Sequence, residues 1–208
     1  MRTKEELRLY FENGDRPTQN HFWEWQDSYW HKDEKILLKS VESIEKIYPL
    51  IVNGEYKGSY LSITLPDNIR KIADSAFVYS GFSYQIREVI LNEGLEEIGR
   101  SAFGSQNIKK IKTPSTLKII RQSAFAGQAN ANNYSDSTEE IILNEGLEVI
   151  EDYAFASGNS LKSLYLPDSL QSVGLNALAI PSLQTVSAPA GLDLSSAGIP
   201  ESAIITYR

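Results

Sequence analysis

The sequence predicts an α+β chain in which a small helical N-terminal head precedes a solenoid of about five to six stacked turns. Three observations predict this fold class. The phrase EVILNEGLE at 88–96 recurs as EIILNEGLE at 140–148, other segments align with both copies in one register, and residues before about 58 do not follow that register. Neither copy contains His, Cys or Ser, so a stacked structural unit explains the recurrence better than a duplicated catalytic motif.

The composition excludes several classes of function. A chain of 208 residues with 41% hydrophobic and 23% charged residues can bury a sizeable core. A formal net charge of −7 argues against nucleic acid or an anionic membrane as a partner. No apolar run approaches the roughly 20 residues that a membrane span needs. The absence of cysteine excludes disulfides and thiolate catalysis, and the first residues lack the apolar segment of a secretory signal.

The predicted head, residues 1–58, contains three helices and a hairpin. Thr3 and Glu6 form a capping box for the first helix, and Thr18 caps the second. The third helix is predicted from apolar residues at spacings of four, three and four that end before Pro49: Leu37, Val41, Ile44 and Tyr48. Asn53-Gly54 within LIVNGEYKG suits a type I′ turn, so a hairpin is expected to lead into the first solenoid strand.

The second predicted helix concentrates large aromatic residues on two of its sides, which predicts burial on two sides. We predict that these residues form an oligomerisation or attachment surface: Phe22, Trp23, Trp25, Tyr29 and Trp30. Two alternatives stay open. These residues could form a monomeric core that caps the solenoid, or they could form a ligand site. A domain of this size commonly depends on an oligomeric interface, and a homo-oligomer formed through this segment is therefore expected.

The predicted solenoid, residues 59–195, is followed by a C-terminal cap, 196–208. Its repeats begin at positions 65, 91, 113, 143, 166 and 188. In each repeat a strand with inward apolar residues two apart precedes a turn, a second apolar pair three apart follows, and an Ala-Phe pair enters the core. Phe77, Phe103, Phe125 and Phe155 should lie in one column. No single repeat could bury its apolar face, but stacked neighbours can.

The pattern Leu-Pro-x-x-Leu-x-x-Ile-x-x-x-Ala-Phe resembles the BspA-type leucine-rich repeat, which is found in many bacterial surface and adhesive proteins. The resemblance covers about residues 60–195 and implies a leucine-rich-repeat solenoid and a binding function. The chain departs from the family by lacking the cysteine that often follows Ala-Phe, and by lacking an export signal.

The segment LRLYFENGDRPTQNHFWEWQDSYWHKDEKI, at 7–36, also resembles N-terminal segments of phage and prophage structural proteins from gut bacteria. This second resemblance implies a virion component assembled in the host cytoplasm. Its head would attach to other virion proteins or oligomerise, and its repeats would project as a fibre or decoration domain. The alternative is a BspA-like adhesin or protein-interaction module on the bacterial cell surface.

The sequence supports no catalytic or metal-binding chemistry. Asp27, Ser28 and His31 are close in sequence, but one helix cannot readily arrange them as a catalytic relay. His21 and His31 have no matching carboxylate pair, and the loop NNYSDSTEE lacks the acidic spacing of a calcium loop. We therefore predict a non-enzymatic protein without cofactor or metal.

Binding is predicted on the residues of the strands that alternate with the inward ones. The predicted binding face consists of Glu88, Ile90, Lys110, Lys112, Glu140, Ile142, Ser163 and Tyr165. Tyr134, in the polar loop 126–138, is added because long loops on rigid scaffolds often carry recognition. The expected ligand is a protein or a surface glycan.

Overall fold

The computed structural model describes residue 18 and residues 44–52, 55–79, 81, 85–127, 138–157 and 160–208. Contacts divide the chain into two units, Met1–Val41 and Glu42–Arg208, and the second contains almost all of the described residues. The first two predicted helices, the five aromatic residues of the head and Tyr134 lie outside the described part of the chain.

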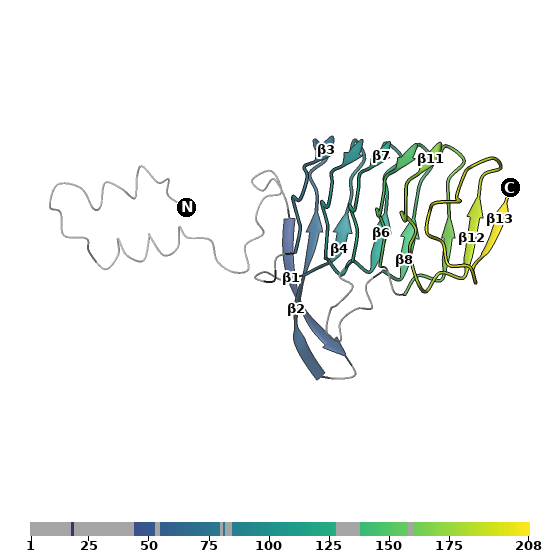
Figure 1. Cartoon of the computed structure of the whole chain (residues 1–208). Coiled ribbons are helices and arrows are strands. Elements are labelled where there is room, and N and C mark those ends of the chain that lie inside the picture. Colours follow the sequence, from purple (N-terminus) through teal and green to yellow (C-terminus); the bar gives the residue numbers. More distant parts are fainter. Residues whose placement is uncertain are drawn as a thin grey trace. The chain divides into compact units, whose positions relative to one another are not determined.

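One parallel strand per turn forms the first side of the solenoid (Figure 1). The strand order is β1-β2-β4-β6-β8 in one sheet and β10-β12-β13 in the next, with β10 beside β8. Every pairing after the β1–β2 hairpin is parallel. The strands are β1 Ile44–Val52, β2 Glu55–Thr64, β4 Ile86–Ile90, β6 Lys110–Lys112, β8 Glu140–Ile142, β10 Ser163–Tyr165, β12 Thr185–Ala188 and β13 Ile204–Tyr207.

Two-residue strands form a second parallel sheet, whose order is β11-β9-β7-β5-β3 (Figure 1). In each strand the second residue is buried, and it is the later member of the predicted apolar pair. The apolar spacing predicts the burial but not the strands, because two residues are too few to show an alternation. The strands are β3 Lys71–Ile72, β5 Glu97–Ile98, β7 Ile119–Ile120, β9 Val149–Ile150 and β11 Ser172–Val173.

The core is one continuous cluster of apolar residues from every turn. The predicted column of phenylalanines is confirmed, and we call it the phenylalanine stack: Phe77, Phe103, Phe125 and Phe155. Successive ring centroids are 5.1, 5.2 and 5.5 Å apart, with interplanar angles of 8°, 6° and 1°. Phe77, at one end, is half-buried, whereas the next three are buried. Offset or parallel aromatic contacts add to the burial of apolar area, so the stack links neighbouring turns.

The corner that carries the stack requires an unusual backbone. The residue before each Ala-Phe or Ala-Leu pair has a positive φ, between 49° and 58°, although none of these residues is glycine. This left-handed conformation directs the next N–H groups toward the following turn, as in Phe103 N–H to Ala124 C=O at 2.8 Å. Four of the five alanines at the corner, Ala102, Ala124, Ala154 and Ala177, are fully buried, whereas Ala76 in the first turn is exposed. The five positive-φ residues are Ser75, Ser101, Ser123, Tyr153 and Asn176.

The hairpin prediction is confirmed, and the prediction of the third helix is wrong for Ile44 and Tyr48, while Leu37 and Val41 lie outside the described residues. β1 and β2 pair antiparallel, with Val52 opposite Glu55 on either side of Asn53-Gly54. Residues 44–52, which include Ile44 and Tyr48 of the predicted helix and the Pro49 expected to follow it, form strand β1 instead. Its β-branched and aromatic content suits a strand, and the long pairing with β2 overrides the weak helical spacing. Pro49 is accommodated because β1 is an edge strand.

A candidate interaction face on the parallel strands

The outward residues of the strands form two rows, which together we call the strand face. One row runs through Glu88, Lys110, Glu140, Ser163 and Thr185, and the other through Ile90, Lys112, Ile142, Tyr165 and Ser187. The intervening residues are buried in the core. All eight predicted strand residues of the binding face therefore share one surface, while their role in binding remains a prediction.

The second row carries large apolar side chains that the fold leaves in solvent. Ile90 is 54% exposed and Tyr165 is 48% exposed, and Ile142 is half-buried between them. Exposed apolar groups on one row of a rigid surface are typical of interaction sites, whereas isolated ones are common everywhere.

Lysines on and beside this face differ in their ion pairs. Lys109 Nζ lies 2.8 Å from Glu139 Oε1, and Lys110 Nζ lies 2.5 Å from Glu140 Oε2. Lys112 has no carboxylate oxygen within ion-pairing distance among the described residues, although its charge contributes weakly to the field at Glu93. The exposed pairs contribute little to stability, because solvent screens them.

A groove with a volume of about 500 Å³ opens on the strand face between β4 and β6. Ile90 and Lys112 line it, together with Glu88 and Lys110, and buried Leu91 belongs to its floor. Four of the predicted face residues therefore meet at one concave site. We call this site the strand-face groove.

The groove lies where neighbouring turns are less tightly hydrogen-bonded. At the β2–β4, β6–β8 and β10–β12 steps the first residue after a strand donates to the next turn, as in Leu65 N–H to Ile90 C=O at 3.1 Å and Thr113 N–H to Ile142 C=O at 3.0 Å. The equivalent bonds from Leu91 N–H to Lys112 C=O, at the groove, and from Leu143 N–H to Tyr165 C=O are not formed in the described chain. The β4–β6 register likewise contains one residue pair, whereas that of β6–β8 contains three.

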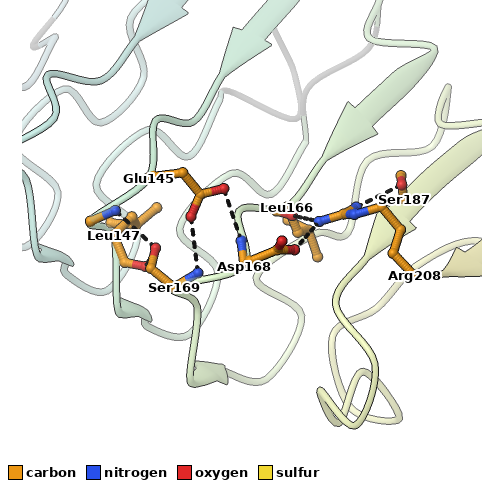
Figure 2. A network of polar contacts seen from close by, with 8 residues as sticks. Glu145, Leu147, Leu166, Asp168, Ser169, Ser187 and Arg208 are labelled. Atoms are coloured by element: carbon orange, nitrogen blue, oxygen red, sulfur yellow. Dashed lines mark hydrogen bonds and ion pairs between the residues drawn. The ribbon is translucent and has the colours of Figure 1, made fainter.

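The rim of the strand face is fixed by a repeated polar network, which Figure 2 shows at its second occurrence. Glu145 accepts from the backbone N–H groups of Asp168 and Ser169 at 3.0 and 3.1 Å. Ser169 Oγ accepts from Gly146 N–H at 2.9 Å and donates to Leu147 C=O at 2.8 Å. Side chains of one turn therefore satisfy backbone groups of its neighbour.

The first occurrence has the same plan. Glu93 accepts from Ser115 N–H and Ser115 Oγ, and Thr116 Oγ1 bridges Gly94 N–H and Leu95 C=O. These hydrogen bonds, chiefly the one from the Ser115 backbone, hold the pKa of Glu93 below its usual value. The phrase NEGLE recurs because its Glu and Gly are parts of this network. Gly146 has φ +108°, and a Cβ there would lie 2.4 Å from Ser115 O.

Arg208 completes the rim beyond the second network (Figure 2). Its guanidinium donates to Leu166 C=O at 2.8 Å and to Ser187 Oγ at 2.7 Å, and lies 2.6 Å from Asp168 Oδ1. It also lies 4.0 Å from the centroid of the Tyr165 ring. The Leu166 carbonyl is equivalent to that of Thr113, to which Asn144 Nδ2 donates. Tyr165 is therefore partly covered by the chain itself, whereas Lys112 is not.

Sequence reasoning missed Glu93, Asn144 and Arg208 as residues that shape the face. The alternation of Pro-containing turns with Asn-Glu-Gly turns was a signal for the first two, because it implies a two-turn unit with reciprocal contacts. Nothing in the sequence indicated where Arg208 would fold back.

The described residues offer no metal centre: no three His, Cys, Asp or Glu side chains among them are placed to share an ion. In the same part of the chain, no helix has the length and hydropathy of a membrane span.

Comparison with known proteins agrees with this geometry. The family model of the BspA type leucine rich repeat region, with six copies, matches residues 53–137 and 129–198, well over half of the chain. The crystal structure of a leucine-rich repeat protein from T. pallidum is similar in fold, with a TM-score of 0.50 and 22% identity over 70% of this chain and 72% of that one. A comparison with curated proteins finds no match. The chain belongs to the BspA-type leucine-rich repeat family.

Proposed function

We propose that this protein is a non-enzymatic interaction module that binds a protein partner through the strand face. Repeats of this family are typically non-catalytic and serve in protein binding. A BspA-like adhesin on the bacterial cell surface is the setting that fits the family best.

The observation that carries the proposal is the exposed row of the strand face. Ile90, Ile142 and Tyr165 occupy positions where the solenoid requires only a strand residue, and polar residues occupy them elsewhere, such as Ser187. Burial of Ile90 or Tyr165 against a partner would remove apolar area from water that folding leaves exposed.

A virion fibre or decoration protein is the second candidate. It rests on the resemblance of residues 7–36 to phage structural proteins, and on the expectation that Phe22, Trp23, Trp25, Tyr29 and Trp30 mediate attachment or homo-oligomerisation. The family match covers the repeats and supports the interaction module, which is therefore preferred.

Site-specific photo-crosslinking tests the proposed function. A photoreactive phenylalanine derivative replaces Ile142 on the strand face, and in a matched variant it replaces Lys118, which is exposed next to the second sheet. Both full-length variants are expressed in the native cell, illuminated and analysed for covalent adducts by mass spectrometry. The purified partner is then tested for direct binding.

We expect a protein adduct with the Ile142 variant and none with the Lys118 variant. Adducts with capsid or tail proteins would instead support the virion interpretation. Equal adduct formation at both positions, or none at Ile142, would refute a strand-face site.

A further inference from the structure

We propose that the strand-face groove binds an extended segment of a partner protein in which one Asp or Glu side chain, flanked by apolar residues, pairs with Lys112. This inference rests on the proposed function and adds the chemistry of the partner. Three features of the groove lead to it: an uncompensated cation, a free backbone donor and apolar residues on both sides.

Lys112 supplies the cation. Neighbouring Lys109 and Lys110 are each neutralised by a glutamate one turn further along, whereas the residue one turn beyond Lys112 is Ile142. No described carboxylate lies within ion-pairing distance of Lys112. An ammonium group beside apolar side chains in a groove is complementary to a carboxylate, which gains a charge-assisted hydrogen bond there.

The backbone at the floor supplies a second donor. Leu91 N–H has no acceptor in the described chain, because its bond to Lys112 C=O is not formed. A buried N–H group without a protein partner is normally met by water or a ligand. Two donors, one of them charged, favour an occupant that brings an acceptor, and a carboxylate is the strongest acceptor that a protein side chain offers.

The two acidic residues of the groove limit what can enter. Both carboxylate oxygens of Glu93 accept hydrogen bonds from Ser115, at 3.1 and 2.9 Å, so Glu93 is committed to the rim. Glu88 lies two residues before Ile90 on the same face of β4 and is exposed. It would repel a second acid nearby, so the groove should select a single acidic residue rather than an acidic run.

The apolar residues beside Lys112 determine which residues should flank the acidic residue of the bound segment. Ile90 and Ile142 occupy the turns on either side of Lys112, each roughly 5 Å away because that is the spacing of neighbouring strands. A segment that crosses the strands with its carboxylate at Lys112 would place apolar side chains over both isoleucines. The C-terminal half of the face offers no equivalent site, since Arg208 lies over Tyr165 there.

Selection of random short peptides displayed on yeast tests the proposal, with the full-length chain as bait. The peptides that are enriched are then titrated with Lys112→Glu, Lys112→Gln and, as the matched control, Lys162→Glu. Lys162 is also exposed and without a carboxylate partner in the described chain, but it does not line the groove. Denaturant midpoints establish that each variant is folded. If Lys112→Glu does not fold, Lys112→Gln is used in its place.

We expect enriched peptides with one acid between apolar residues. Their Kd should rise about tenfold or more with Lys112→Glu, several-fold with Lys112→Gln, and less than about twofold with Lys162→Glu. Added salt should weaken binding to the natural chain more than to Lys112→Gln.

The proposal is overturned if no peptide is enriched, if the enriched peptides are basic or polyacidic, or if Lys112→Glu binds them unchanged. The proposed function is judged separately. If Ile142 still crosslinks to a protein, the strand face remains an interaction site although the carboxylate inference fails, and if Ile142 gives no adduct, both fail.

Discussion

The phenylalanine stack and the strand face are built from the same turns of the chain, yet only the stack repeats its chemistry. Phe103, Phe125 and Phe155 occupy one column with nearly parallel rings. The exposed row of the strand face instead changes from Ile90 to Lys112 at the next turn. Stacking therefore constrains the core positions, which must match their neighbours above and below, while outward positions are free to serve a partner.

Removal of a ring from the phenylalanine stack should destabilise the protein most. Phe103→Ala removes a fully packed ring between two others and should lower the free energy of unfolding by about 3–5 kcal/mol. Phe77→Ala, at the half-buried end, should cost clearly less. Urea denaturation followed by circular dichroism measures both. If both variants lost the same free energy of unfolding, the stack would not act as a shared core.

A smaller loss of stability is expected from changes in the polar network at the rim of the strand face. Ser169→Ala leaves Gly146 N–H and Leu147 C=O without their bridging hydroxyl and should cost about 1 kcal/mol. Ser163→Ala, on the exposed strand face, is the control and should change stability by less than about 0.5 kcal/mol. If the two serines behave alike in denaturation, the network of Figure 2 does not stabilise the rim.

A gain in stability is expected at the corner of the stack. Tyr153 has φ 58°, a conformation that asparagine adopts more readily than a bulky residue. Tyr153→Asn should therefore raise the free energy of unfolding by about 0.5 kcal/mol. Ser163→Asn, in a strand with ordinary φ, should give no gain. A thermal melt that shows destabilisation by Tyr153→Asn would mean that the tyrosine contributes more by packing than it costs in backbone strain.

The smallest expected effect is the dependence of stability on pH, because the carboxylates of Glu93 and Glu97 lie near the solvent. Hydrogen bonds from Ser115 lower the pKa of Glu93, and the hydrogen bond from Arg121 is the main cause that lowers the pKa of Glu97. The stability that these two carboxylates contribute is therefore complete above their pKa in the unfolded chain, about 4.3. It is lost as the pH falls through their lower pKa in the folded chain. Denaturant midpoints measured between about pH 6 and pH 3 should fall less for the double variant Glu93→Gln, Glu97→Gln than for the natural chain. An equal fall would exclude these carboxylates as contributors.

Most of the solenoid could be predicted because its periodic residues are the ones that stacking demands. The inward pairs such as Leu95 and Ile98, the phenylalanine column and the Asn53-Gly54 hairpin follow from local spacing and turn chemistry. The first half of strand β1 was predicted as a helix because Ile44 and Tyr48 also fit a helical spacing, and only pairing with β2 decides between the two.

The candidate site was predictable in position but not in shape. Alternation along the strands placed Ile90 and Lys112 on the outer face, where the structure has them. The groove coincides with a missing hydrogen bond between Leu91 and Lys112, and the cover over Tyr165 depends on Arg208, about 40 residues later in the chain. Contacts of that kind have no signature within a short window of sequence.

The variant Ile142→Arg separates the role of the strand face in binding from any role in stability. The partner identified by crosslinking is titrated with this variant and with the natural chain, and the denaturant midpoints of both are measured. We predict that Kd rises by at least about tenfold while the midpoint is unchanged, because Ile142 belongs to the strand face and not to the core. Unchanged affinity in a folded variant would contradict the claim that the strand face is the binding site.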